Sequence, residues 1–166
     1  MREGDAIGDE AVVGDEWERF GDALVDEVAR LPVEAIMVLT ERGQPRHFVQ
    51  FVQTGDHLRA EATGSVGGPA EPAPVRERRL LEAVGWREPP PGDATPAWLY
   101  RLPWPATTEE YRRLTDAAVT ALRDVQEVAR PSDLSYRSWE RGRQRRALGL
   151  PGLEPEQGYE PQEGSS

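Results

Sequence analysis

The stretch Arg46–Ala62, RHFVQFVQTGDHLRAEA, decides the fold of this chain. Two runs in it, 49–53 and 58–62, alternate apolar and polar residues on either side of Thr54-Gly55-Asp56-His57. Alternation with a period of two places one set of side chains on a core face of a strand and the other set towards solvent. The stretch therefore predicts a β-hairpin.

A two-residue turn at Gly55-Asp56, with Gly at positive φ, sets the register of this hairpin. The paired residues are then Gln53 with Leu58, Phe51 with Ala60, and Val49 with Ala62. The predicted core face carries Val49, Phe51, Leu58, Ala60 and Ala62. The predicted outer face carries Gln50, Val52, Arg59 and Glu61.

The composition is that of an acidic, cysteine-free, single-domain protein. The 166 residues carry a net charge of −10, and all 20 basic residues are Arg, which we interpret as the mark of a high-GC genome. An acidic chain repels phosphates, so nucleic acid and anionic membranes are unfavourable partners. No apolar run has the length of a membrane span and no signal peptide is visible, so we expect a cytoplasmic protein.

Helical spacing flanks the hairpin on its N-terminal side. Residues 1–14 are acidic and expected to be disordered, and a capping-box-like Asp15 starts an apolar stripe that ends before Pro32. The short apolar run 34–40 predicts a central strand. A three-stranded meander results.

Further elements follow the meander, separated by loops at 63–74 and 88–97. A helix is expected from Val75 to Val84, with Gly85 as its left-handed last residue and Trp86 packed back on its final turn. A strand is expected at 97–102. The capping box Thr107-x-x-Glu110 then starts the longest helix, whose apolar 3,4 spacing continues to Val128.

The fold class is therefore α+β, in the order α-β-β-β-α-β-α, with an antiparallel sheet and helices packed on one face. The domain is expected at 15–131. Residues 132–166 form a partly disordered extension, first Arg-rich and then acidic.

No motif in the sequence predicts catalysis, a metal or a cofactor. The two histidines, His47 and His57, fall far apart in the hairpin register, so a shared metal site is not expected. No Ser lies in a nucleophile-elbow context, and no phosphate-binding glycine motif occurs.

The Arg-rich segment admits two interpretations. It could bind nucleic acid, through Arg137, Trp139, Arg141, Arg143, Arg145 and Arg146. We favour a helix that docks on the acidic N-terminal region of the same chain. For Trp86, Trp98 and Trp104, packing at the core edge competes with an aromatic contact surface for a partner.

Three segments carry a resemblance to a known family. The strands Phe48–Gln53 and Leu58–Ala62, and the helix end Val84-Gly85-Trp86-Arg87-Glu88-Pro89, resemble the TY-Chap family of actinobacteria, relatives of YbjN proteins and type III secretion chaperones. The resemblance covers about residues 15–130. It implies a homodimeric, chaperone-like fold that binds protein segments without chemistry.

We therefore predict a non-enzymatic protein-binding module, with a nucleic-acid-associated accessory protein as the alternative. The candidate partner-binding residues are Gln50, Val52, Arg59, Glu61, Trp98 and Trp104.

Overall fold

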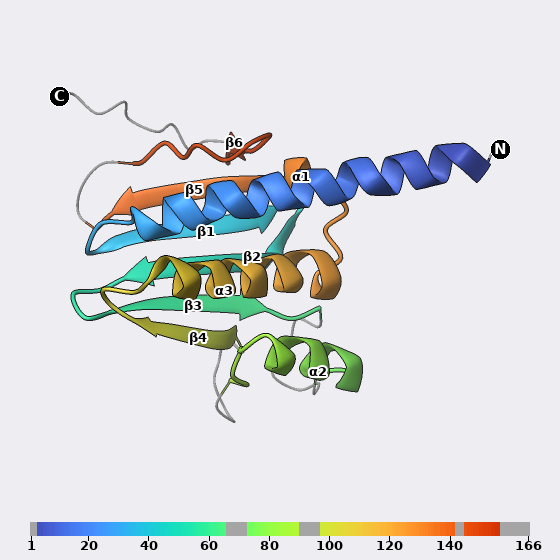
Figure 1. The fold of residues 1–166 in the computed structure, drawn as a ribbon. Coiled ribbons are helices and arrows are strands. Elements are labelled where there is room, and N and C mark those ends of the chain that lie inside the picture. Colours follow the sequence, from blue (N-terminus) through green and yellow to red (C-terminus); the bar gives the residue numbers. More distant parts are fainter. Residues whose placement is uncertain (1–2, 66–72, 90–96, 142–144, 157–166) are drawn as a thin grey trace.

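The computed structural model describes residues 3–65, 73–89, 97–141 and 145–156, with side chains from residue 11 onward. Its elements are α1 (Glu3–Ala29), β1 (Ala35–Glu41), β2 (Gln44–Gln53), β3 (His57–Thr63), α2 (Val75–Ala83), β4 (Ala97–Pro103), α3 (Thr108–Val119), η1 (Thr120–Val125), η2 (Pro131–Asp133), β5 (Leu134–Glu140) and β6 (Glu154–Pro155). Figure 1 shows α1 and α3 on the same side of one sheet. The predicted α+β class and its element order are confirmed, and two further strands follow the last helix.

The described strands form one sheet in the order β4-β3-β2-β1-β5-β6. Every pair is antiparallel except β5 and β6. In the central hairpin, Val49 faces Ala62, Phe51 faces Ala60 and Gln53 faces Leu58. The predicted register is confirmed.

The turn of this hairpin is closed by polar groups. The Thr54 N–H donates to the carbonyl of His57 at 2.9 Å, and the Thr54 hydroxyl donates to Asp56 Oδ1 at 3.0 Å. The glycines with positive φ in the described chain are Gly43, Gly85 and Gly152. The expected positive φ at Gly55 is therefore wrong, because Thr54 and Asp56 hold the turn without it.

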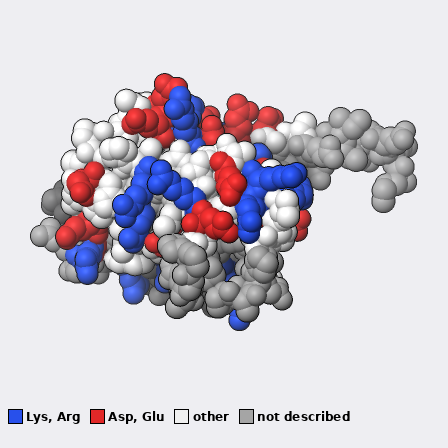
Figure 2. Space-filling view, turned by 90° about the horizontal axis from the view of Figure 1, so that it is seen from below, with Lys and Arg blue, Asp and Glu red and all other residues white. Residues whose placement is uncertain are grey.

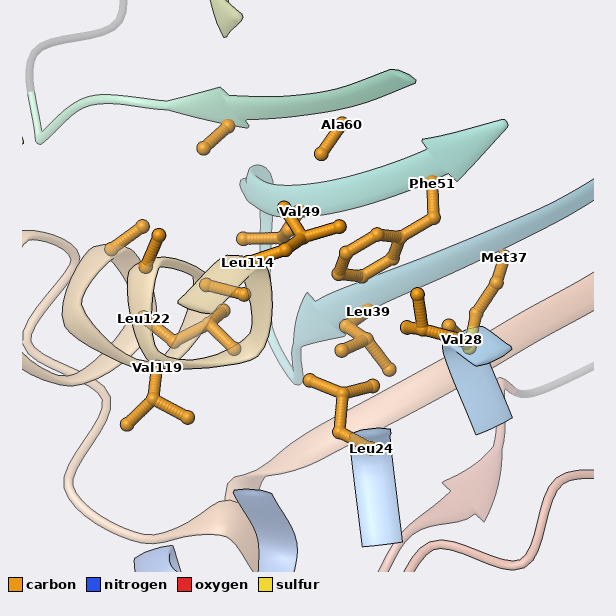
Figure 3. Packing of buried hydrophobic residues seen from close by; sticks show 14 of the residues in the cluster. Leu24, Val28, Met37, Leu39, Val49, Phe51, Ala60, Leu114, Val119 and Leu122 are labelled. Atoms are coloured by element: carbon orange, nitrogen blue, oxygen red, sulfur yellow. The ribbon is translucent and has the colours of Figure 1, made fainter. Parts of the chain in front are cut away.

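The core lies between the sheet and the two long helices. Figure 3 shows Leu24 and Val28 of α1 and Leu114 of α3 gathered with the inner side chains of the sheet, among them Phe51 and Leu39. These side chains are at most 2% exposed. Burying one Leu or Phe side chain contributes about 1.5–3 kcal/mol, so this one-sided layer supplies much of the stability.

The first helix differs from the expectation at its start. α1 begins at Glu3, well before Asp15, so residues 3–14 are helical where disorder was expected. Glu and Ala favour a helix there, and no Pro stops it. Figure 1 shows this N-terminal part extending past the sheet. No described helix is long and apolar enough to cross a membrane.

The strand β5 was expected to lie outside the domain. Instead, Leu134–Glu140 pairs with the whole of β1, and Ala35 faces Glu140. The expected helix in the Arg-rich segment is wrong, since Leu134, Tyr136 and Ser138 alternate into the core as a strand requires. The domain thus extends beyond residue 131.

The last long helix changes its hydrogen bonding before it ends. α3 starts at the predicted Thr107–Glu110 capping box and continues into the π-helical η1. Just after it, the buried Gln126 donates through Nε2 to the carbonyls of Phe48 and Thr63, at 3.1 and 2.9 Å. This amide ties α3 to the hairpin at the end away from its turn.

The end of α2 is built as predicted. Gly85 has a φ of 108°, and the Trp86 N–H donates back to the carbonyl of Leu81 at 3.0 Å. The Trp86 indole donates to the Ala117 carbonyl at 2.9 Å and meets Tyr100 edge to face. Most of both predicted loops, residues 66–72 and 90–96, lies outside the described residues.

Substituting Gly85 tests this helix end. A Cβ at Gly85 would lie 2.7 Å from the Tyr100 ring, on a backbone that favours glycine. We expect Gly85→Ala to lower the free energy of unfolding by about 1–3 kcal/mol, measured by urea denaturation. Gly14→Ala is the matched control, because α1 leaves open space there and alanine favours a helix by about 1 kcal/mol. Equal effects of the two substitutions would contradict the assignment.

Candidate functional site

The candidate site is the face of the sheet opposite α1 and α3. Predicted partner-binding residues Gln50, Val52, Arg59 and Glu61 all lie on this face, with Gln50 facing Glu61 and Val52 facing Arg59. Their neighbours in sequence on β2 and β3 point into the core. No helix of the described chain packs on this outer face, which we call the free face.

An apolar row crosses three strands of the free face. Ile36 of β1 faces Val52 on one side and Trp139 of β5 on the other. All three are partly exposed. Val38, one position further along β1, is 4% exposed between its neighbours. Val52 therefore belongs to a continuous apolar strip.

Charged pairs border this row at both ends. Arg59 Nε lies 3.2 Å from Glu61 Oε1 beside Val52. At the other end, the Arg137 guanidinium lies 5.8 Å from the centre of the Trp139 ring and pairs with Glu156 at 2.6 Å. An apolar centre with a charged border is typical of surfaces that bind polypeptides.

The two tryptophans predicted to share this surface lie elsewhere. Trp98 is 3% exposed and faces Ala62 on the covered side of the sheet, so it packs in the core. Trp104 follows β4 at its C-terminal end and is 43% exposed. The free face and Trp104 are separate features of the surface.

The histidines lie at opposite ends of the hairpin, as the register predicts. His47 Nδ1 lies 3.2 Å from Glu41 Oε2, and His57 Nδ1 lies 2.7 Å from Asp56 Oδ1. The hydrogen bond from His57 lowers the pKa of the exposed Asp56 carboxyl. In the described ranges, no three His, Asp or Glu side chains are grouped to hold a metal ion.

The residues of the nucleic-acid alternative do not form one basic surface. Arg137 and Trp139 lie on the free face, whereas Arg145 and Arg146 run along the edge of β5. Arg143 lies outside the described residues. Glu154 lies opposite Ser135 of β5, and Glu156 forms an ion pair with Arg137. No observation supports nucleic-acid binding.

A hollow follows the edge of β4. It has a volume of about 500 Å³ and includes Arg87, Tyr100 and Arg101 in its lining. Burial raises the pKa of the Tyr100 hydroxyl. On this side of the molecule, Figure 2 shows Arg side chains interleaved with Asp and Glu. Its charges are mixed, so it does not select one class of charged ligand.

Two residues of the row were not predicted. Ile36 lies in a continuous apolar run, whose period does not indicate which residues face the core. Trp139 lies in LSYRSWE, whose alternation indicates a strand. Because this segment was interpreted as a charged helix, Trp139 was not placed on a face of the sheet.

A one-sided sheet with a partly apolar free face has the architecture of a binding module. The model of the family described as T3SS (YopN, CesT) and YbjN peptide-binding chaperone 3, TY-Chap3, matches residues 10–140. The chain belongs to this family. The match points to a non-enzymatic, chaperone-like protein. No curated protein and no solved structure matches the chain.

Fluorescence quenching tests where the tryptophans lie. We expect Trp104→Phe to lower the acrylamide quenching constant of the chain, because it removes the indole that is 43% exposed. Trp98→Phe is the matched control and should remove only shielded emission. A drop in quenching for Trp98→Phe alone would place Trp98 at the surface.

Proposed function

We propose that this chain holds an extended peptide segment of a protein partner on the free face of its sheet, without chemistry of its own. Family membership supports a peptide ligand. The position of the binding site is supported by the continuous apolar row of Trp139, Ile36 and Val52, on the face that no described helix covers.

The chemistry of the free face suits an extended peptide. Apolar side chains of the ligand would cover the row and gain about 25 cal/mol for each Å² of apolar surface removed from water. Gln50, beside the row, has amide groups that can donate to and accept from a peptide backbone. Such contacts tolerate many sequences as long as apolar residues alternate.

The charged pair at the border of the row would favour ligands that carry a charge beside their apolar residues. Arg59 and Glu61 already neutralise each other at 3.2 Å. A ligand with a charge of either sign next to its apolar residues would find a partner there, and an exposed pair of this kind adds at most about 1 kcal/mol. Apolar contact at Val52 therefore supplies more of the affinity than the ion pair.

Val52→Asp tests the site directly. Peptides selected from a displayed random library against the wild-type chain should bind the variant at least about tenfold more weakly. Losing one buried apolar contact costs about 1.5 kcal/mol, and a desolvated carboxylate adds to this loss. Binding is measured by fluorescence anisotropy.

Val75→Asp is the control, since it makes the same chemical change at a residue of α2 that is 64% exposed and lies off the sheet. It should bind the selected peptides like the wild-type chain. If both variants are folded by circular dichroism and bind the peptides with equal affinity, the free face is not the binding site.

We propose further that the chain acts in the cytoplasm of an actinobacterium and forms a homodimer. The resemblance to the actinobacterial TY-Chap proteins supports the source, and the all-Arg composition fits a high-GC genome. The resemblance to TY-Chap proteins, which implies a homodimer, supports the oligomeric state.

Light scattering tests the homodimer. The wild-type chain should elute with twice its 18.5 kDa mass at concentrations well above the dissociation constant. It should shift towards the monomer on dilution, because two identical chains associate by mass action. A strict monomer at every concentration would contradict this part of the proposal.

A further inference from the structure

The segment Arg145–Glu156 lies along the outer edge of β5 in the manner of a bound strand. From 145 to 150, the more buried residues are Arg146, Leu148 and Leu150, and the residues between them are exposed. Leu150 is 5% exposed and joins the main hydrophobic core. Period-two burial is the pattern of an extended peptide that presents alternate side chains to a receptor.

The backbone of this segment pairs with the edge of β5. The Arg146 N–H donates to the Ser138 carbonyl at 2.6 Å, and the Glu156 N–H donates to the Tyr136 carbonyl at 2.9 Å. Both acceptors point away from β1 at the edge of the sheet. The segment thus satisfies carbonyls that a foreign strand could otherwise use.

The middle of the segment lies between α1 and β5, against Glu27 and Tyr136, and we call this place the notch. The Gly149 N–H donates to Glu27 Oε1 at 3.0 Å, and the Leu148 N–H donates to the Tyr136 hydroxyl at 3.4 Å. Glu27 is 7% exposed and also pairs with Arg30. A buried carboxylate aimed at a peptide N–H is a specific recognition group.

The notch favours a small residue at its centre. A Cβ at Gly149 would lie 3.3 Å from Glu27 Oε1, closer than most side chains are found. Leu148 and Leu150 on either side pack against the core. The fitted pattern is Leu-Gly-Leu.

A turn then leads the chain away from the notch. The Leu153 N–H donates to the Leu150 carbonyl at 3.3 Å, and Gly152 has a φ of 78°. Proline at 151 followed by glycine suits a type II turn. The pairing is sparse, because Pro151 and Pro155 have no N–H to donate to the sheet.

The family match ends at residue 140, where β5 ends. The notch belongs to the matched domain, whereas the segment that fills it follows that domain in the chain. We infer that the α1–β5 notch is a second peptide-binding site, filled here by the chain's own segment 145–156, and that it takes other extended peptides with a Leu-Gly-Leu pattern. The inference rests on the proposed function only for the class of ligand.

The test uses the full chain and a labelled peptide, RRALGLPGLEPE, equal to residues 145–156. Leu150→Asp in the chain should detach its own segment, since it places a carboxylate in the core. The peptide should then bind this variant at least about tenfold more tightly than the wild-type chain, by fluorescence anisotropy. Ala147→Asp is the matched control in the chain, because Ala147 is exposed in the same segment, and it should behave like wild type.

Variants of the peptide test the recognition groups. A peptide with the Gly149→Val change should bind the Leu150→Asp chain more weakly, because its side chain crowds the Glu27 carboxylate. A peptide with Ala147→Ser should bind unchanged. Equal binding of both peptides would overturn the Leu-Gly-Leu assignment.

A cleaved full-length chain covers the case in which Leu150→Asp does not fold. A protease site introduced at 142–144 changes none of the described residues of the notch or of the segment. After cleavage, excess labelled peptide should exchange with the chain's own segment. If the folded, cleaved chain shows no exchange, the segment is a structural cap and the inference fails.

A further variant separates this inference from the proposed function. In the Leu150→Asp background, Val52→Asp should leave binding of the labelled peptide unchanged, because Val52 lies on the free face. If Val52→Asp abolishes this binding, the peptide occupies the free face, and the inference fails while the proposed function stands.

Discussion

Burial of a single face of the sheet is the constraint on which the rest of this structure depends. α1 and α3 cover one side, where Phe51 and Leu39 are fully buried. The other side has no such layer in the described chain. A sheet of this kind must leave one face and its edges for solvent, for its own chain or for partners.

The free face and the two edges of the sheet differ in what covers them. The free face keeps an apolar row from Trp139 to Val52, bordered by charged pairs. The outer edge of β5 is paired by segment 145–156. On β4, Arg87 pairs with Leu99 and covers part of the edge. The surfaces that can accept a polypeptide therefore follow from where the helices stop covering the sheet.

Sequence patterns predicted the parts of the fold that rest on local periodicity. The register of Val49 with Ala62 followed from period-two alternation and the loop length, and it placed Val52 on the free face. The side facing the core was harder to assign for Ala97–Leu102, since both alternate sets there contain apolar residues, and Trp98 proved to be buried. Segment 145–156 depends on a distant contact with Glu27, which no local pattern reveals.

The position of segment 145–156, a few residues after the end of β5, has a thermodynamic consequence. A ligand joined to its receptor by a few residues experiences an effective concentration on the order of millimolar. Contacts with a dissociation constant well below millimolar then keep the notch mostly occupied, and a separate peptide must compete with that local concentration to enter. The sparse pairing caused by Pro151 and Pro155 is thus compatible with high occupancy of the notch. A separate peptide of modest affinity can still exchange with the chain's own segment.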